Sequence, residues 1–308
     1  MSGRYRAVLA LILTLSGGMA MAQPPAEPLS LWYRQPAKQW VEALAVGNGR
    51  LGAMVFGGVA EERIQLNEDT LWAGGPYDPA NPDALEALPQ VRELIFAGQY
   101  RQASRLVGQK MMAKPLSQMP YQCVGDLLLS FPGMEGATDY RRDLNLNTAV
   151  ATVTYKVDGV CYTRRVFSSP VDQIIVVHLQ ADKLGKISFT AGMKTQQKAS
   201  AAVEAPNTLV MQGVNGSSAG IDGALKFQAR AAVTVSGGQI VSENDQIIVT
   251  KADSALLLVA AATNYKSFND VSGDPEVLAK EAVAKAGGKS YDVLLKAVSY
   301  THLTLPTN

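Results

Sequence analysis

Carboxylate, amide and aromatic side chains gather in one short segment, residues 64–77 (IQLNEDTLWAGGPY). Asn67, Glu68 and Trp72 are the parts of a sugar site, because carboxylates and amides bind hydroxyls and an indole gives an apolar platform for a ring face. Paired carboxylates also suit glycoside hydrolysis. Adjacent Glu68 and Asp69 point to opposite sides of an extended segment, so we do not assume that they flank one bond. The alternative is turn-forming acids beside a core Trp, and the residue types leave both interpretations open.

A second polar and aromatic segment, residues 119–126 (MPYQCVGD), leads into a predicted strand. Tyr121, Gln122 and Asp126 are candidates to reach a ligand. The alternative is that they cap the start of the strand.

Other motifs give weaker indications of chemistry. The glycine-rich segment 46–58 (VGNGRLGAMVFGG) contains G-x-G-x-x-G, but no apolar strand precedes it and no βαβ unit follows. We therefore interpret its glycines as turn and close-packing residues. His178 lies in an apolar run and is predicted to be a sheet residue rather than a catalyst. The charges at 139–143 and at 164–165 are predicted to lie on solvated faces.

Composition excludes several classes of function. The 308 residues carry 28 Lys and Arg against 27 Asp and Glu, which leaves no positive excess for nucleic acid. Two His and two Cys make a multi-His or four-Cys metal centre improbable, so no metal and no cofactor is expected. The 47% share of hydrophobic residues is that of a globular chain rather than a disordered one.

The first 22 residues are predicted to be a cleaved signal peptide. Arg4 and Arg6 precede an apolar run from residue 7 to about 15, and the A-x-A site ends at Ala22. The run is shorter than the roughly 20 residues that span a bilayer, so we expect no stable membrane insertion after cleavage. The mature chain is expected in the periplasm or outside the cell. There Cys123 and Cys161 either form a disulfide or remain two buried thiols, which the sequence leaves open.

The fold class is predicted to be mainly β: a large antiparallel sandwich of two sheets with a helical hairpin insertion. Between residues 127 and 263 the hydrophobic period is two, and Asp158-Gly159 is a strong hairpin signal. About eleven or twelve strands are expected, more than the ~7 of an immunoglobulin-like module. Residues 83–112 are predicted to form a helical hairpin against a sheet, with Pro89 at a first helical position and Gly98 as a stop.

The domain boundaries follow from these patterns. Residues 29–272 are predicted to be the sandwich, and residues 273–297 the start of a helical linker with Asp274 and Ser290 as N-caps. The helical pattern stops at about Ala297. The tail 298–308 (VSYTHLTLPTN) resembles a translated sequencing adaptor, which predicts an artefact and a truncated chain.

Several of these segments in register resemble the amino-terminal domain of glycoside hydrolase family 95. The similarity lies in residues 46–58, 64–77, 119–122, 125–127, 139–142 and 271–275, and extends over about residues 31–297. The resemblance implies an exported α-L-fucosidase, with some relatives preferring α-L-galactosides. It also implies a β super-sandwich, a helical linker, an (α/α)6 barrel and a carboxy-terminal β domain.

In this family, hydrolysis inverts the anomeric configuration and needs no metal. A glutamic acid serves as the general acid, and an aspartate, helped by an asparagine, activates water. Those residues lie in the barrel, so the resemblance assigns no catalytic residue here, and we expect the chain to be inactive alone. Its expected partners are a fucosylated glycan and the missing barrel. Asn67, Glu68, Trp72, Tyr121 and Gln122 are the candidates for the cleft rim. The alternatives are a module that binds fucosylated glycans without cleaving them and an exported structural domain.

Overall fold

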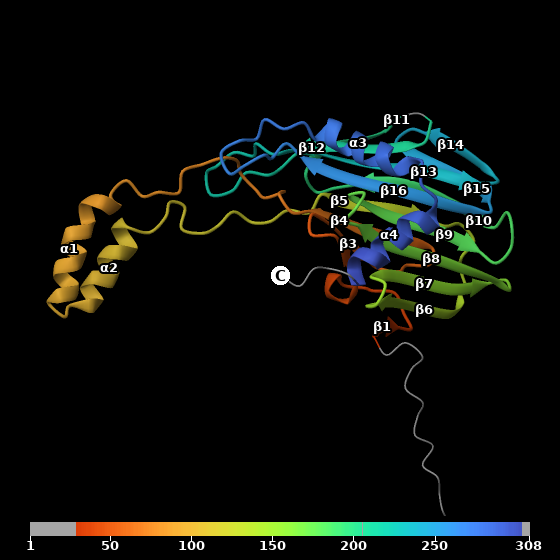
Figure 1. The fold of residues 1–308 in the computed structure, drawn as a ribbon, viewed down its shortest axis with the longest axis horizontal. Coiled ribbons are helices and arrows are strands. Elements are labelled where there is room, and N and C mark those ends of the chain that lie inside the picture. The colour runs from red at the N-terminus through yellow and green to blue at the C-terminus, as the bar shows by residue number, and fades with distance from the viewer. Residues whose placement is uncertain (1–28, 205, 304–308) are drawn as a thin grey trace, which may run out of the picture.

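The computed structural model describes residues 29–204 and 206–303, with only the backbone of Tyr300 and Leu303. The predicted signal peptide lies outside the described residues. Two antiparallel sheets pack face to face, which confirms the predicted sandwich (Figure 1). The order of the nine-stranded sheet is β1 (Ser30–Tyr33), β6 (Thr138–Asn145), β7 (Val150–Val157), β8 (Val160–Ser169), β9 (Ile174–Ala181), β16 (Ser254–Thr263), β13 (Lys226–Ser236), β12 (Thr208–Val214) and β11 (Lys198–Glu204).

The seven-stranded sheet has the order β14 (Gln239–Glu243), β15 (Gln246–Ala252), β10 (Ile187–Lys194), β5 (Gly125–Ser130), β4 (Glu61–Glu68), β3 (Leu51–Val55) and β2 (Leu44–Gly47). A short 3-10 helix, Trp40–Glu42, precedes β2. The described residues thus form sixteen strands, more than the predicted eleven or twelve.

Strict alternation along the strands builds the core between the sheets. In β3, Leu51, Ala53 and Val55 are buried, and their partners across the ladder in β4 include Ile64 and Leu66. The predicted hairpin between β7 and β8 is confirmed. Asp158 and Gly159 have φ values of 49° and 70°, the left-handed pair that a two-residue type I′ turn requires.

Two helices cover part of the outer face of the nine-stranded sheet. They are α3 (Pro275–Gly287) and α4 (Tyr291–Leu303). The Asp274 side chain accepts from two backbone N–H groups of α3, and Ser290 Oγ accepts from Val293 N at 3.4 Å, so both predicted caps are confirmed. Their apolar residues join sheet residues in a second core, which comprises Val150, Phe167, Ile174, Val176, Leu258, Ala260, Ala262, Ala279, Ala286, Leu294 and Val298.

Helix α4 runs past the point where the sequence pattern predicts its end. It continues from Ala297 to Leu303, and Val298 is only 2% exposed. Thr301 Oγ1 donates to the Ala297 carbonyl at 2.9 Å. The adaptor origin of residues 298–308 stays a prediction.

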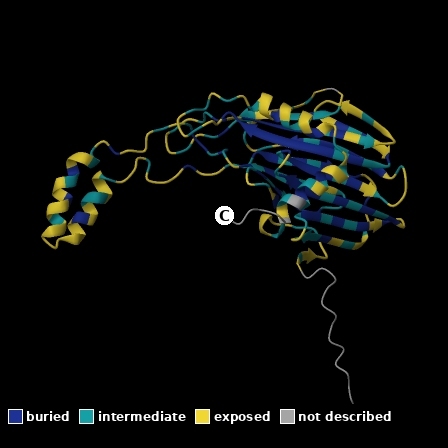
Figure 2. Ribbon diagram, viewed as in Figure 1, coloured by how far each residue is buried: buried dark blue, intermediate teal, exposed yellow. Residues whose placement is uncertain are grey.

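The helical hairpin consists of α1 (Ala84–Phe96) and α2 (Tyr100–Lys110). It stands away from the sandwich at the end of two extended connections, and most of its surface is exposed (Figure 2). The prediction that it lies against a sheet is therefore wrong. Pro89 lies inside α1 rather than at its start, whereas Gly98, with φ of 74°, ends α1 as predicted.

Arginines point into the sandwich where the sequence predicts solvated charge. Arg142 and Arg164 are 1% and 2% exposed. Arg164 forms an ion pair with Glu62 across the two sheets and donates to the Gly58 carbonyl at 2.9 Å. Arg142 donates to the Gln35 and Glu42 carbonyls at 2.8 and 2.6 Å. The solvated assignment is therefore wrong for these two, because paired and hydrogen-bonded arginines can be buried.

The two cysteines are free thiols. Cys123 precedes β5 in one sheet, while Cys161 pairs with Lys156 beside the β7–β8 turn in the other. The disulfide that the sequence left open is not formed. Burial raises the pKa of the Cys123 thiol.

Replacing one partner of the buried ion pair is expected to destabilise the fold strongly. Arg164→Met leaves the Glu62 carboxyl without its ion-pair partner in the core, which should lower the free energy of unfolding by about 3–5 kcal/mol. Urea denaturation measures this loss. Arg165→Met is the matched control, because the neighbouring residue points to the outer face; we expect a loss below about 1 kcal/mol. Equal losses in the two variants would contradict the interpretation.

His178 lies in β9, as predicted, and stacks on Tyr291 of α4 with ring centroids 4.1 Å apart. Burial lowers the pKa of His178 below its ordinary 6.5, Arg165 lowers it further, and Asp292 opposes them. As the pH falls through about 6.5, the unfolded chain therefore binds a proton at His178 that the folded chain does not bind. It follows that the free energy of unfolding falls as the pH falls below 6.5.

His178→Phe keeps the stacking ring and removes the titration. As the pH falls from 7.5 to 5.5, we expect the free energy of unfolding of the variant to rise relative to that of the wild type, by at most ~1.4 kcal/mol per pH unit. Thermal melts of both proteins across this range measure the difference. A difference that does not change with pH would refute the role of His178.

Candidate functional site

The candidate site lies at the end of the sandwich from which the α1–α2 hairpin, called the arm below, extends (Figure 1). Four segments meet there: the end of β4 with the first connection to the α1–α2 hairpin, the second connection from this hairpin, the β12–β13 loop and the β16–α3 loop. Backbone hydrogen bonds join them, from Ala73 N to the Pro120 carbonyl at 2.9 Å and from Gly74 N to the Gly216 carbonyl at 2.8 Å. The chain therefore brings residues 67–77, 119–124, 215–225 and 264–271 into one cluster.

Glu68, the last residue of β4, faces the interior rather than solvent. It is 3% exposed, and Arg50 Nη1 lies 3.3 Å from its Oε1. Thr70 donates to its Oε2 from N at 2.9 Å and from Oγ1 at 2.6 Å. Burial raises the pKa of Glu68, while the Thr70 bonds and Arg50 act in the opposite direction. Glu68 is therefore a positioning residue that fixes the turn leading to Trp72.

The glycine-rich segment 46–58 supplies the other partner of this ion pair. Asn48 Oδ1 accepts from Arg50 N and Leu51 N at 3.1 and 2.8 Å, which closes the turn around Gly49 (φ 91°). Arg50 then donates to Gln173 Oε1 and the Ala261 carbonyl, both at 2.8 Å. The glycines serve turns, as the sequence indicates, but the sequence pattern did not predict a role for Arg50.

Trp72 and Tyr121 form an isolated β-bridge, with their rings edge to face at 5.5 Å between centroids. The Trp72 indole donates to the Asp69 carbonyl at 2.9 Å. The Tyr121 hydroxyl donates to the Glu68 carbonyl at 3.1 Å and lies 3.3 Å from Asn67 Oδ1. Burial raises the pKa of Tyr121 to about 12, so it remains a neutral hydrogen-bond donor.

Gln122 holds the β12–β13 loop in place. Its Oε1 accepts from Gly216 N at 2.9 Å, and its backbone N donates to the Leu71 carbonyl at 2.9 Å. Asp126 is engaged by Arg63 Nε at 2.9 Å. All five predicted rim residues thus lie together, but only Trp72 lines the adjoining hollow.

This hollow has a volume of about 320 Å³. Its walls are mainly aromatic and small residues, which are Thr70, Trp72, Ala73, Gly74, Gly75, Pro76, Tyr77, Pro79, Gln118, Met119, Leu225, Tyr265, Ser267, Phe268 and Val271. No Asp, Glu, His or Cys lines it within the part of the chain that the structure describes. The hollow can hold an apolar ring face but offers no carboxylate, imidazole or thiol.

Asn215, which sequence analysis missed, secures the hollow. It is 5% exposed, donates from Nδ2 to the Trp72 and Gly74 carbonyls at 2.6 Å each, and accepts from Leu225 N at 2.9 Å. The Asn215-Gly216 dipeptide, a common turn signal, is the feature that could have indicated it.

Among residues 29–204 and 206–303, no group of three or more His, Cys, Asp or Glu is placed to hold a metal ion. Nor does any described helix combine the length and apolar character needed to cross a membrane.

Comparison with known proteins identifies the class. Residues 31–268 match the family described as "Glycosyl hydrolase family 65, N-terminal domain", and the chain belongs to this family. It is 36% identical over 268 residues to "Alpha-L-fucosidase 2" of Arabidopsis thaliana, covering 79% of this chain and 31% of that protein. It is 29% identical over 304 residues to "Probable alpha-fucosidase A" of Aspergillus niger, covering 89% of this chain and 36% of that protein.

A second "Probable alpha-fucosidase A", of Aspergillus oryzae, is 32% identical over 162 residues, which cover 49% of this chain and 22% of that protein. The chain thus spans about a third of the length of the first two relatives. Its two-sheet fold and these matches fit the N-terminal domain of a fucosidase.

Asn215→Ala is expected to loosen the hollow. The substitution leaves the Trp72 carbonyl and the Leu225 N–H without their side-chain partner and removes one of the two donors to the Gly74 carbonyl, so the free energy of unfolding should fall by about 2–3 kcal/mol. Chemical denaturation measures it. Ser217→Ala in the same loop is the control, with an expected change below about 0.5 kcal/mol. A stability unchanged by Asn215→Ala would show that these bonds do not hold the loops.

Proposed function

We propose that this chain is the N-terminal domain of an exported, inverting α-L-fucosidase of glycoside hydrolase family 95. The observation that carries the proposal is the 36% identity to the Arabidopsis fucosidase across most of the chain. The motifs in residues 46–58 and 64–77 support the family-95 assignment. The predicted signal peptide supports export to the periplasm or the extracellular space.

In this proposal the domain positions a catalytic barrel and lends its loops to the cleft rim. The described hollow supports a binding role, because Trp72 and its aromatic neighbours can contact a sugar ring while no carboxylate or imidazole is among the described residues that line the walls. Glu68 is the most conspicuous carboxylate of this region, and its ion pair with Arg50 keeps it from acting as an acid or base on a substrate. We therefore propose that the general acid and base lie elsewhere in the full-length enzyme.

The alternative is a module that binds fucosylated glycans without cleavage. The same aromatic hollow favours it, since glycan binding needs no catalytic carboxylate. Calorimetric titration of the 308-residue chain with fucose and a fucosylated oligosaccharide separates the two. Saturable heat from this chain alone that Trp72→Ala abolishes favours the module, whereas heat that this variant keeps, or no heat, favours a rim that is completed by the barrel.

The activity assay uses two proteins: the 308-residue chain and the longer protein read from the genomic DNA beyond the codon for Ala297. We expect the longer protein to release β-L-fucose first from an aryl α-L-fucoside, which proton NMR detects, and the 308-residue chain to release none. Comparable turnover by the shorter chain would falsify the division of roles.

Within the longer enzyme, Trp72→Ala and Gln122→Ala test the rim. Because Trp72 offers ring surface and Gln122 holds the neighbouring loop, we expect kcat/KM to fall by roughly 10-fold or more, the equivalent of about 1.4 kcal/mol. Leu85→Ala, on the exposed far arm, is the control. An unchanged kcat/KM in both variants would end the rim assignment.

A further inference from the structure

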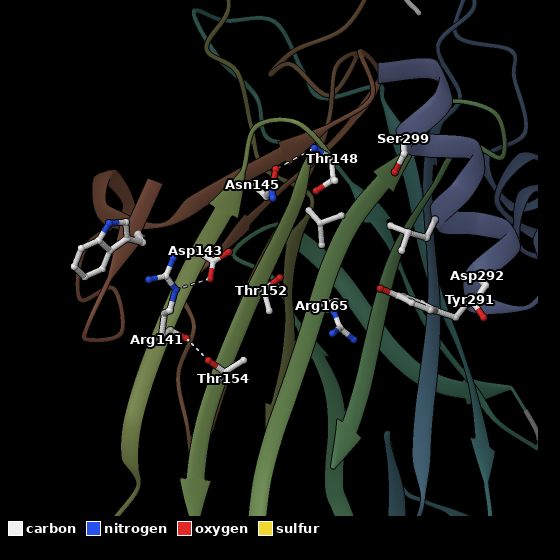
Figure 3. A pocket seen from close by; sticks show the side chains of 13 residues that line it. Arg141, Asp143, Asn145, Thr148, Thr152, Thr154, Arg165, Tyr291, Asp292 and Ser299 are labelled. Atoms are coloured by element: carbon white, nitrogen blue, oxygen red, sulfur yellow. Dashed lines mark hydrogen bonds and ion pairs between the residues drawn. The ribbon is translucent and has the colours of Figure 1, made fainter. Parts of the chain in front are cut away.

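A large groove lies on the outer face of the nine-stranded sheet (Figure 3). It shares no lining residue with the hollow around Trp72, which we call the loop hollow. Its volume is about 930 Å³, within the range of about 300–1,000 Å³ typical of small-ligand sites. Strands β1, β6, β7 and β8 form its floor, and helix α4 forms one wall with Tyr291, Asp292, Leu295 and Ser299. We call it the sheet groove.

The floor of the sheet groove consists of polar side chains in register. One cross-strand row contains Trp32, Asp143, Thr152 and Arg165, each directly opposite the next. A second row pairs Arg141 with Thr154. Side chains in one row stand on the same face, and neighbouring strands lie ~4.8 Å apart. The floor therefore presents hydrogen-bonding groups at intervals comparable to the length of a sugar ring.

Arg141 is fixed in position before any ligand arrives. Its Nε donates to Asp143 Oδ2 at 3.0 Å, and its guanidinium lies 5.2 Å from the centroid of the Trp32 ring. Trp32 is itself 45% exposed at the edge of the sheet. A guanidinium held by a carboxylate and a ring loses little freedom when it donates to a ligand.

The charges of the sheet groove balance. Arg141 and Arg165 stand against Asp143 and Asp292, so the groove has no excess charge to select an anion or a cation. Its threonines and asparagine alternate with apolar Val150 and Leu295, so it does not suit a purely apolar ligand either. The ligand that fits is neutral, extended and rich in hydroxyl groups.

We propose that the sheet groove is a second carbohydrate site, which binds a neutral oligosaccharide along the two polar rows. It is separate from the loop hollow around Trp72, and it does not depend on the proposed fucosidase activity.

The test is calorimetric titration of the 308-residue chain with cellotetraose, maltotetraose and 2′-fucosyllactose, and with a heparin-derived tetrasaccharide as the anionic probe. We expect at least one neutral sugar to bind with a Kd on the order of 1 mM, and heparin not to bind. The double variant Thr152→Val and Thr154→Val keeps the shape of the floor and removes two hydroxyls. It should weaken binding by about 5- to 100-fold, as expected for the loss of two hydrogen bonds.

Three controls make the outcomes decisive. Thr234 lies in the same cross-strand row as Thr152 but outside the groove. The variant Thr234→Val should therefore bind the sugar as the wild type does. Leu85→Ala, on the exposed α1–α2 hairpin, should also leave the affinity unchanged, and Trp72→Ala reports any sugar that binds in the loop hollow instead. Thermal melts verify that each variant is folded. Binding of heparin alone, no binding of any neutral sugar, or loss of affinity in Trp72→Ala but not in the threonine variant would each overturn the proposal.

Discussion

Arg50, the ion-pair partner of Glu68, joins the two sheets at the end where the candidate site lies. Arg50 leaves the turn before β3 and reaches β16 and the segment before β9, while Glu68 ends β4 and holds the turn to Trp72. Buried ion pairs contribute little net stability but become costly when left unpaired. We interpret this pair, together with Arg164 and Glu62, as fixing how the two apolar sheet faces align. This alignment therefore also determines where the loops at that end lie.

This constraint also limits what the site can do. The bonds that hold Glu68 in the interior keep it away from a substrate, and Tyr121 and Gln122 are likewise engaged with backbone groups of neighbouring loops. What remains accessible is a hollow with aromatic walls and no Asp, Glu, His, Cys, Lys or Arg among the described residues that line it. Such a surface favours positioning and recognition over proton transfer, which agrees with a domain that works beside a separate catalytic unit.

Local signals predicted local structure well. The turn at Asp158, the caps at Asp274 and Ser290, and the two-sheet architecture depend on short-range patterns, and the structure confirms them. The inward-facing arginines and the detached hairpin arm depend on distant partners, which a charge pattern or a helical period cannot specify. The same holds for the site: its residue types were visible in the sequence, but the burial of Glu68 required knowledge that Arg50 would face it. Asn215 was missed because its partners lie about 140 positions away.

The outer face of the nine-stranded sheet changes from apolar to polar side chains along its strands, and this explains why a groove exists there. Where Phe167 and Val176 face outward, α3 and α4 cover them and build the second core. Where Thr152 and Arg165 face outward, there is no apolar surface to recruit a helix, so the sheet stays open beside the edge of α4. The packing of Leu294 and Val298 that secures α4 therefore also fixes the wall of the sheet groove. Folding and ligand recognition on this face thus depend on one boundary, the line along β7 and β8 where apolar residues give way to polar ones.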